Sequence, residues 1–579
     1  MVDEQVLRLQ CRYPFWLRGP IRLVATALVS VLSIPAAHAF QFDLGDSDIR
    51  LRWDNTVKYS VAMRTESRSG VLTDPDRNPS NTNQDDGDQN FDKGLISNRV
   101  DLYSEADLIY KGFGLRASGA AWYDTVYNST NDNDSPFTAN ARSVDHDEFT
   151  DDTRDLHGRK AELLDAFAFG KVNMGPTTTS FRVGQYAMQW GESLFFGNNG
   201  IAGGMAPIDV VKLLSVPNSQ FKEIIRPVPQ TSAQVQIGPS VAIGGYYQFG
   251  WEKTVLPAVG SYFSSADILD EGAEQLIVAS VPGVGPVAGL YKGDDQDAKD
   301  SGQGGVQLRV RPGFGLDLGF YAIQYHDKTP QIYVMPGVDP NIGVINPGVL
   351  DPSDPSKAGE YFLTYPENIR AYGMSATTTW DVWNFAAEVS MRRNTPLVSD
   401  PVTIIPAFDL NAGADNDDNP GYAVGRSVHA QFNWFAVFGP SFISNEASFL
   451  GEVAWNRVTS ITKNSDVVDP NAERTGLGFR MVYEPTYRQV MSGLDLSVPV
   501  GLAYFPKGRS MVVSNFGPDN GGDMSLGLNA TYLDVWRFAL NYTHFYGPAE
   551  GALDSETHLS LKQSLADRDF VAFSVRRTF

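Results

Sequence analysis

The stretch from Ile49 to Met63 alternates between two kinds of side chain. Seven of its eight odd positions are apolar or aromatic, and four of the seven even positions from 50 to 62 are charged. Successive side chains of a strand point to opposite faces, so this stretch has one apolar and one charged face. A strand that crosses an outer membrane needs about 9–11 residues, apolar toward lipid and polar toward the lumen. The pattern therefore predicts a membrane-spanning strand.

Similar stretches follow along the chain, joined alternately by short and by long connections. The further predicted strands are 95–111, 113–128, 160–172, 178–188, 231–238, 240–251, 303–312, 314–326, 370–380, 383–393, 424–438, 445–458, 473–484, 492–505, 523–532, 535–546 and 569–579. With the N-terminus in the periplasm, every short joint is periplasmic and every long one is external, as in bacterial outer-membrane barrels. The fold class is therefore all-β, a transmembrane antiparallel β-barrel.

The strand number and the closure of the barrel also follow from this reading. We expect about 18 strands, and 16 are possible because 160–172 could be helical and 231–238 is weak. The first strand should pair with 569–579 to close the barrel. No repeat of 20–50 residues is evident, which disfavours a propeller or a solenoid.

Residues 1–39 have the features of a cleaved signal peptide. A basic beginning leads into an apolar run, Leu23 to Ile34, and Ala37-His38-Ala39 supplies a small-residue cleavage site. The alternative, a membrane anchor, is disfavoured because the apolar run is short for a bilayer. We expect residues 40–579 to form a single barrel domain in the outer membrane of a Gram-negative bacterium. The only cysteine, Cys11, lies within the signal peptide.

Composition adds a strongly acidic charge. The net charge is −22, and removal of residues 1–39, with four basic and two acidic residues, leaves 42 basic and 66 acidic residues, or −24. Nucleic acid is therefore not expected as a partner. The acidic residues gather in the long joints, where a divalent ion could bridge them to lipopolysaccharide. Asp415, Asp417 and Asp418 are weak candidates for a metal site, because they lack the spacing of an EF-hand loop. A solvated acidic loop is the alternative, and no cofactor is expected.

The charged face of the first strand carries candidate lumen residues. These are Arg50, Arg52, Lys58 and Arg64. Inside a wide barrel they could simply balance acidic groups on neighbouring elements. Alternatively, they could form a track that guides anions or carboxylates through the lumen.

Residues 189–229 differ from the other long joints because they are apolar and rich in glycine. Such a segment would be poorly solvated outside the barrel, so it should pack as a plug or constriction in the lumen or as a lid on the rim. Its glycines would allow a tight backbone path. Its charged residues would then need partners in the polar lumen. The candidate constriction residues are Trp190, Glu192, Asp209, Lys212, Glu223 and Arg226.

The C-terminal strand ends on an aromatic residue preceded by alternating apolar positions. Phe579 is therefore expected to act as a signal for the barrel-insertion machinery, although Arg577 interrupts the apolar face. No histidine of the mature chain lies in a known hydrolase or metal motif. The protein is not expected to be an enzyme, and a lipid hydrolase would need a Ser–His pair on the lipid face.

Several motifs resemble one family. They are FQFD, WDNTVKYSVAMR, RVGQYAMQWGESLFF, APIDVVKLL, VPNSQFKEIIRPVP, YRQVMSGLDLSVPVGLAY and VWRFALNYTHFYG. In combination they resemble the proteobacterial domain-of-unknown-function 1302 family over essentially the whole mature chain. The resemblance implies an outer-membrane barrel without catalytic residues. It also implies a possible link to a transporter of the resistance-nodulation-division type and to a periplasmic protein.

These observations predict a function without catalysis. We expect a channel or transport component for hydrophobic or amphipathic compounds, acting alone or with an inner-membrane exporter, in which the segment 189–229 narrows the route. The alternative is a structural or adhesive protein that acts through its acidic surface loops.

Overall fold

The computed structural model describes residues 40–43, 48–217, 219–281, 284–339, 344–405 and 410–579. The predicted signal peptide, residues 1–39, lies outside the described residues. Within the part described, none of the helices is long and apolar enough to cross a bilayer.

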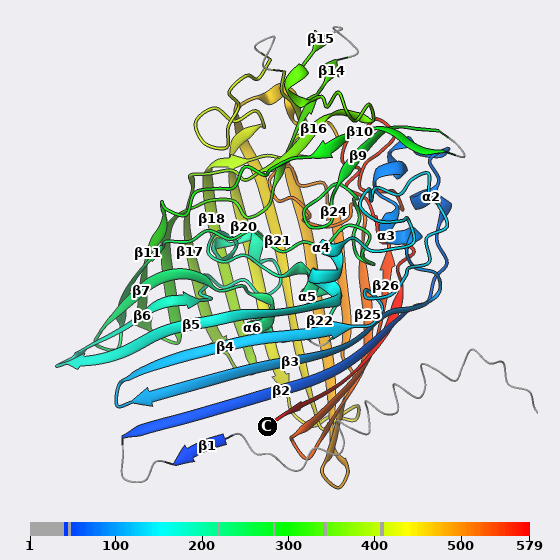
Figure 1. The fold of residues 1–579 in the computed structure, drawn as a ribbon. Helices are drawn as coiled ribbons and strands as arrows, with labels where there is room; N and C mark the ends of the chain where they lie inside the picture. Colours follow the sequence, from blue (N-terminus) through cyan, green and yellow to red (C-terminus); the bar gives the residue numbers. More distant parts are fainter. Residues whose placement is uncertain (1–39, 44–47, 218, 282–283, 340–343, 406–409) are drawn as a thin grey trace, which may run out of the picture.

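One antiparallel sheet closes on itself to form the barrel (Figure 1). The sheet has 20 strands. β1 is a short additional strand, and β23 and β24 occupy a single position in the wall between β22 and β25, so the closed wall has 18 strands. The wall strands are β2 (Ile49–Arg64), β3 (Gly94–Tyr110), β4 (Phe113–Asp124), β5 (Arg159–Met174), β6 (Thr177–Tyr186), β7 (Val228–Ile237), β8 (Val241–Gln248), β11 (Gln303–Gly313), β12 (Leu316–Tyr325), β17 (Ile369–Trp380), β18 (Trp383–Pro396), β20 (Val424–Phe438), β21 (Glu446–Lys463), β22 (Thr475–Met491), β23 (Leu494–Ser497), β24 (Val500–Lys507), β25 (Gly521–Tyr532), β26 (Trp536–Tyr546) and β27 (Phe570–Thr578). The predicted fold class is thus confirmed.

The strand number is the larger of the two expected. The stretches 160–172 and 231–238, which were the uncertain ones, are both wall strands, β5 and β7. The predicted strand 492–505 is interrupted between Ser497 and Val500. Pro499 lies in this gap, and a proline has no N–H to donate to the neighbouring strand.

The barrel closes where the first and last wall strands meet. β2 pairs with β27 from Thr56–Thr578 to Arg64–Phe570, as the sequence predicted. The backbones of Asn55 and Phe579 exchange hydrogen bonds of 2.8 Å in both directions. Beyond this point β1 (Phe40–Asp43) takes the place of β27 and pairs with Arg50 to Trp53. The first half of β2 is therefore also paired on both edges.

An apolar band surrounds the outside of the wall. Phe320, Met374 and Val389 lie side by side on β12, β17 and β18, and all three side chains are exposed to the surroundings. A continuous apolar band around a closed sheet matches the hydrocarbon layer of a membrane. The predicted alternation, apolar outside and polar inside, is what produces it.

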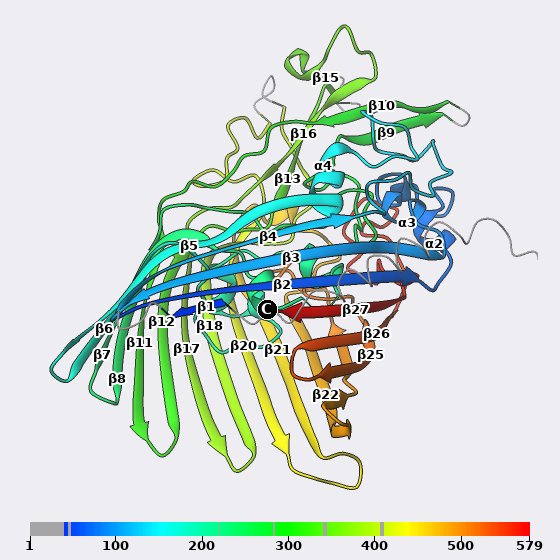
Figure 2. The ribbon, with the colours of Figure 1, turned by 60° about the horizontal axis from the view of Figure 1, so that its bottom comes forward.

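The long joints at the external end contain more structure than their polar composition suggested. A five-stranded sheet stands above the barrel, in the order β19 (Val402–Thr403), β13 (Gln331–Pro336), β16 (Lys357–Thr364), β10 (Gly285–Lys292) and β9 (Gln275–Val281) (Figures 1 and 2). A separate two-stranded sheet, β14 (Val338–Asp339) and β15 (Val344–Ile345), follows β13. The sequence analysis missed this sheet because its strands are short and lie between Pro- and Gly-rich turns.

Short helices occur in the connections. They are α2 (Gly70–Thr73), α3 (Asp86–Gln89), α4 (Asp151–Thr153), α5 (Val210–Leu214) and α6 (Phe221–Ile224), the 3-10 turns η2 (Pro79–Asn83), η4 (Gly197–Asn199), η5 (Ile201–Gly204), η6 (Pro347–Val349) and η8 (Ser465–Val467), and the π-turn η3 (Arg154–Gly158). At the external mouth, loops from three joints share an aromatic core that includes Phe91, Phe149 and Tyr262. The mouth is therefore packed with side chains.

Candidate functional site

The segment between β6 and β7 crosses the inside of the barrel. It contains η4, η5, α5 and α6, which Figure 1 draws among the wall strands. Hydrogen bonds join its first half to β18, β20 and β21, and ion pairs join its second half to β3 and β5. These strands lie on different sides of the barrel, so the segment bridges the lumen. We call residues 187–227 the insert.

Glu452 of β21 holds the tip of the insert. Its carboxylate accepts hydrogen bonds from the backbone N–H groups of Leu194, Phe195 and Phe196 and from the hydroxyl of Ser193. Glu452 is fully buried, with 0% exposure. No ion pair to Glu452 occurs among the described residues, and several N–H donors stabilise such a carboxylate because they supply the positive partial charge that water would otherwise provide.

Glu388 of β18 holds the insert at two further points. Its oxygens accept the N–H groups of Glu192 at 2.8 Å and of Ile201 at 2.7 Å. Gly191 lies against the same carboxylate with φ of +94°, and a β-carbon there would be 2.3 Å from Oε2 of Glu388. The positive φ favours glycine here, and a β-carbon would also displace the carboxylate of Glu388 from its hydrogen bonds.

Charged side chains fix the second half of the insert. Asp209 caps α5 by accepting the N–H of Lys212 at 2.8 Å. Lys212 and Arg226 both bind Glu162 on β5, and both also lie within 4 Å of Asp209. Each charged group of this buried network lies beside a group of opposite charge, as buried charges need to. Glu223 lies within electrostatic reach of Lys58 and Arg576.

Aromatic packing connects the insert to the part of the wall next to β7. Trp190 packs edge-on against Tyr246 of β8, with ring centroids 4.9 Å apart, and tilts over Tyr321 of β12 at 6.4 Å. Met205 is fully buried in the same cluster. Such aromatic pairs contribute packing with a defined geometry.

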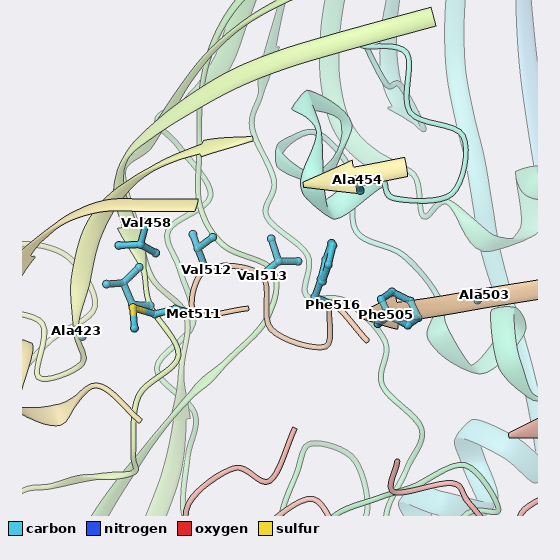
Figure 3. Packing of buried hydrophobic residues seen from close by; sticks show 10 residues of the cluster. Ala423, Ala454, Val458, Ala503, Phe505, Met511, Val512, Val513 and Phe516 are labelled. Carbon is cyan, nitrogen blue, oxygen red and sulfur yellow. The ribbon is translucent and has the colours of Figure 1, made fainter. Parts of the chain in front are cut away.

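A second connection also folds inward and meets the insert. Residues 508–520 place Met511, Val512, Val513 and Phe516 against β21 and β24 (Figure 3). Phe196 of the insert packs against Phe516 with ring centroids 5.8 Å apart. The sequence analysis did not single out this connection, although its Met-Val-Val run is an apolar signal of the same kind as that of the insert.

A cavity of about 390 Å³ lies beside the insert, between it and β6, β7, β8 and β11. Its lining carries three arginines, several glutamines and serines, and Trp190 with Met188 on the insert side. Arg309 is paired with Glu192 and Asp317, and Arg311 with Asp317. Arg182 lies near the rings of Phe167 and Tyr186, and within the described residues it makes no ion pair. The cavity therefore offers one unpaired guanidinium beside an apolar edge.

The predicted basic face of the first strand is mostly neutralised. Arg52 pairs with Asp54, and Lys58 is buried between Asp101 and the carbonyl of Pro217 in the insert. Arg64 is bound to Asp88 and Asp567 under the external loops, away from the insert. Arg50 is exposed near the periplasmic end. Of the four, only Lys58 contacts the insert, so charge balance describes this face better than a continuous track.

The structure also places the remaining candidates. Asp415 accepts two backbone N–H groups of its own loop, Asp417 pairs with Lys299, and the backbone carbonyl of Asp418 accepts Lys463. These groups do not converge on one point among the described residues, and the metal site stays a prediction. The guanidinium of Arg577 lies 4.8 Å from the ring centre of Trp536, so the aromatic ring covers this outward cation.

One arrangement has the outline of a hydrolytic triad. His429 Nε2 lies 2.8 Å from the hydroxyl of Ser427, and Nδ1 lies 3.2 Å from Oδ1 of Asn199 in the insert. Both strand residues are almost fully buried, at 2% and 1% exposure. A nucleophile needs room for a carbonyl carbon at its oxygen and donors for the oxyanion. Ser427 and His429 are instead buried, and their hydrogen bonds to each other and to Asn199 fasten η4 to β20.

Sequence reasoning named the insert but missed the wall residues that hold it. Glu388 and Glu452 stand at lumen-facing positions of predicted strands, surrounded by small and apolar residues. An acidic residue in such a place needs a partner, and this was the signal that could have identified them. Arg182 and Arg309 carried the same kind of signal.

Comparisons with known proteins place the chain in a family. The family described as "Protein of unknown function (DUF1302)" matches residues 21–579. A search of curated proteins finds no match. Among solved structures, OccAB4 of Acinetobacter baumannii is 9% identical with a TM-score of 0.40, and the match covers 91% of this chain and 98% of that one. OpdK of Pseudomonas aeruginosa, solved with vanillate, is 9% identical with a TM-score of 0.38 over 91% and 98%. The outer membrane channel DcaP of Acinetobacter baumannii is 9% identical with a TM-score of 0.37 over 94% and 100%. Because the family match spans nearly the whole sequence, this chain belongs to the DUF1302 family of proteins of unknown function.

Proposed function

We propose that the protein is an outer-membrane channel whose insert controls the passage of amphipathic molecules that carry an anionic group. The observation that supports this most directly is the insert itself, held in the lumen by Glu388 and Glu452 through backbone hydrogen bonds. A segment that only stabilised the barrel would not need to leave a polar cavity between itself and the wall. The function proposed is passage, without catalysis.

The residues that line the cavity beside the insert indicate which class of molecule would pass. The unpaired guanidinium of Arg182 would bind a carboxylate or another anion, because arginine donors match such groups in geometry and charge. Trp190 and Met188 would contact an apolar portion of the same molecule. A cavity of about 390 Å³ is within the usual range for small ligands.

Release of the insert tests the proposal. The double variant Glu388→Ala and Glu452→Ala removes the acceptors for five backbone N–H groups of the insert. We expect a several-fold rise in single-channel conductance in planar bilayers, because the tip would leave the lumen. Glu446→Ala, at a half-buried glutamate that pairs with Arg488 at the periplasmic end of β21, is the control. Equal conductance of the double variant, the control and the wild type would contradict a gating role.

An adhesive or structural role is the second candidate. The five-stranded sheet above the barrel favours it, because this sheet is an ordered surface outside the membrane. Removal of β13 to β16 would abolish such a role but leave the conductance unchanged. The family resemblance extends the channel proposal to a partner transporter of the resistance-nodulation-division type, and co-purification from cross-linked membranes tests this part.

A further inference from the structure

Three buried carboxylates converge under the external loops, away from the insert. Asp85 and Asp86 lie at the start of α3, after β2, and Asp267 lies in the connection after β8. One carboxylate oxygen of each lies within 4.8 Å of those of the other two. Their exposures are 0%, 4% and 0%. Three like charges at this spacing repel each other strongly when water is excluded.

No basic side chain binds these three carboxylates among the described residues. The adjacent Asp88 differs in this respect, because Arg64 and Arg568 both bind it. The group therefore needs either protons or a cation that comes from outside the chain.

Unpartnered oxygen atoms provide an independent observation. Oδ1 of Asp85, of Asp86 and of Asp267 is buried without a hydrogen-bond partner, although the other oxygen of each is bonded. Asn140, which donates its backbone N–H to Asp86 at 3.0 Å, also has a buried Oδ1 without a partner. Buried carboxylate and amide oxygens that accept no hydrogen bond are the kind of ligand that a hard cation takes.

We propose that Asp85, Asp86 and Asp267 bind a calcium ion that ties the external loops together over the barrel mouth. Calcium takes six to eight oxygen ligands at about 2.3–2.6 Å, so two ligands on opposite sides are about 4.6–5.2 Å apart. The three oxygens all lie within 4.8 Å of one another, so none is too far from the others to bind the same ion. The set contains oxygen donors without histidine or cysteine, which favours calcium over zinc.

The loops around this group show what such an ion would connect. Asp85 and Asp86 belong to the connection 65–93, and Asp267 to the connection 249–274. Asn140 belongs to the connection between β4 and β5, and its side chain also binds Asn83 and the carbonyl of Gln275 at the start of β9. Bound calcium would therefore join three loops and support the sheet above them.

Calcium binding to the full-length protein in detergent tests this proposal. The protein is freed of divalent ions with a chelator and titrated with calcium chloride, followed by calorimetry and by thermal unfolding. We expect saturable binding of about one ion per chain and a rise in melting temperature of roughly 2–5 °C at saturation. The double variant Asp86→Asn and Asp267→Asn should lose both effects. Asp466→Asn, an exposed acid in another external loop, should keep them.

Each outcome decides the proposal. Absence of saturable calcium binding by the wild type would overturn it. Equal binding by the wild type and the Asp86→Asn and Asp267→Asn variant would also overturn it, because the ion would then bind elsewhere. If the double variant does not fold, as judged by its heat-modifiable migration on gels, the single variant Asp86→Asn takes its place, and calcium binding equal to that of the wild type would overturn the proposal.

Discussion

At the residue scale, the wall holds the insert by accepting hydrogen bonds from its backbone. Glu388 and Glu452 bind N–H groups, so the identity of most insert side chains matters less than the path of the chain. A hydrogen bond to a charged acceptor contributes about 1.5–3 kcal/mol. Arg182 is the opposite case, because it lines the cavity and pairs with no carboxylate in the part of the chain that the structure describes.

Arg182 should determine the preference for anions. In Arg182→Gln, flux of a small aromatic carboxylate through the reconstituted barrel should fall several-fold, because the unpaired positive charge is lost. Flux of a neutral sugar of similar size should change little. Lys171→Gln removes the same charge at an exposed position on β5 outside the cavity, and should leave both fluxes unchanged. A similar loss of anion flux in both variants would argue against a specific site.

His558 should make one external contact sensitive to pH. Its Nδ1 lies 2.7 Å from Asp400, and this hydrogen bond raises the pKa of His558. The carboxylates of Asp469 and Asp554 also act on it in the same direction. A raised pKa in the folded state means that the contribution to stability is complete below about pH 6.5, the ordinary value for histidine, and is lost as pH rises through the raised pKa.

Hydrogen exchange measures this contact. Protection of residues 553–560, corrected for intrinsic rates, should decrease between about pH 5.5 and about pH 8.5. In His558→Gln the protection should be low and independent of pH. A profile in the wild type that is equally flat would rule out the ion pair as a support for these loops.

At the element scale, the insert is an ordered segment because glycines let its backbone approach the wall. Gly191 and Gly200 both lie against Glu388, and Gly204 lies against Tyr325. The sequence showed that this segment was apolar and rich in glycine, which was enough to separate it from the acidic loops. It could not show which wall residues meet the glycines, because those contacts join positions about 190 residues apart.

Gly191 and Gly197 form a matched pair for this explanation. Gly191→Ala should lower the free energy of unfolding by about 1–3 kcal/mol, because the new β-carbon meets Glu388 and φ is positive. At Gly197 a β-carbon would have no atom within 4 Å. Gly197→Ala should therefore change the free energy of unfolding by only about 0–1 kcal/mol. Urea unfolding of both variants in lipid vesicles measures the difference. Equal changes in the free energy of unfolding of the two variants would mean that the contact at Gly191 does not contribute to stability.

At the scale of the whole molecule, the barrel could be predicted from local pattern and its contents only in part. Alternation of side chains predicted the wall strands, their number and their closure, because strand pairing follows period-2 order. The external sheet and the inward connection 508–520 depend on contacts between distant segments. The buried group of Asp85, Asp86 and Asp267 could not be predicted for the same reason.

The insert lies in the lumen and, as we propose, controls passage; a reversible disulfide between the insert and the wall tests this control. A β-carbon at Gly373 on β17 would lie 2.8 Å from Cγ1 of Ile201 in the insert, so cysteines at both positions can reach each other. The mature chain is expected to have no other cysteine. The pair Ile201→Cys and Gly373→Cys is placed in the Glu388→Ala and Glu452→Ala background and studied in planar bilayers. We predict low conductance when oxidised and a several-fold rise on reduction; no cross-link, or the same conductance in both states, would contradict the account.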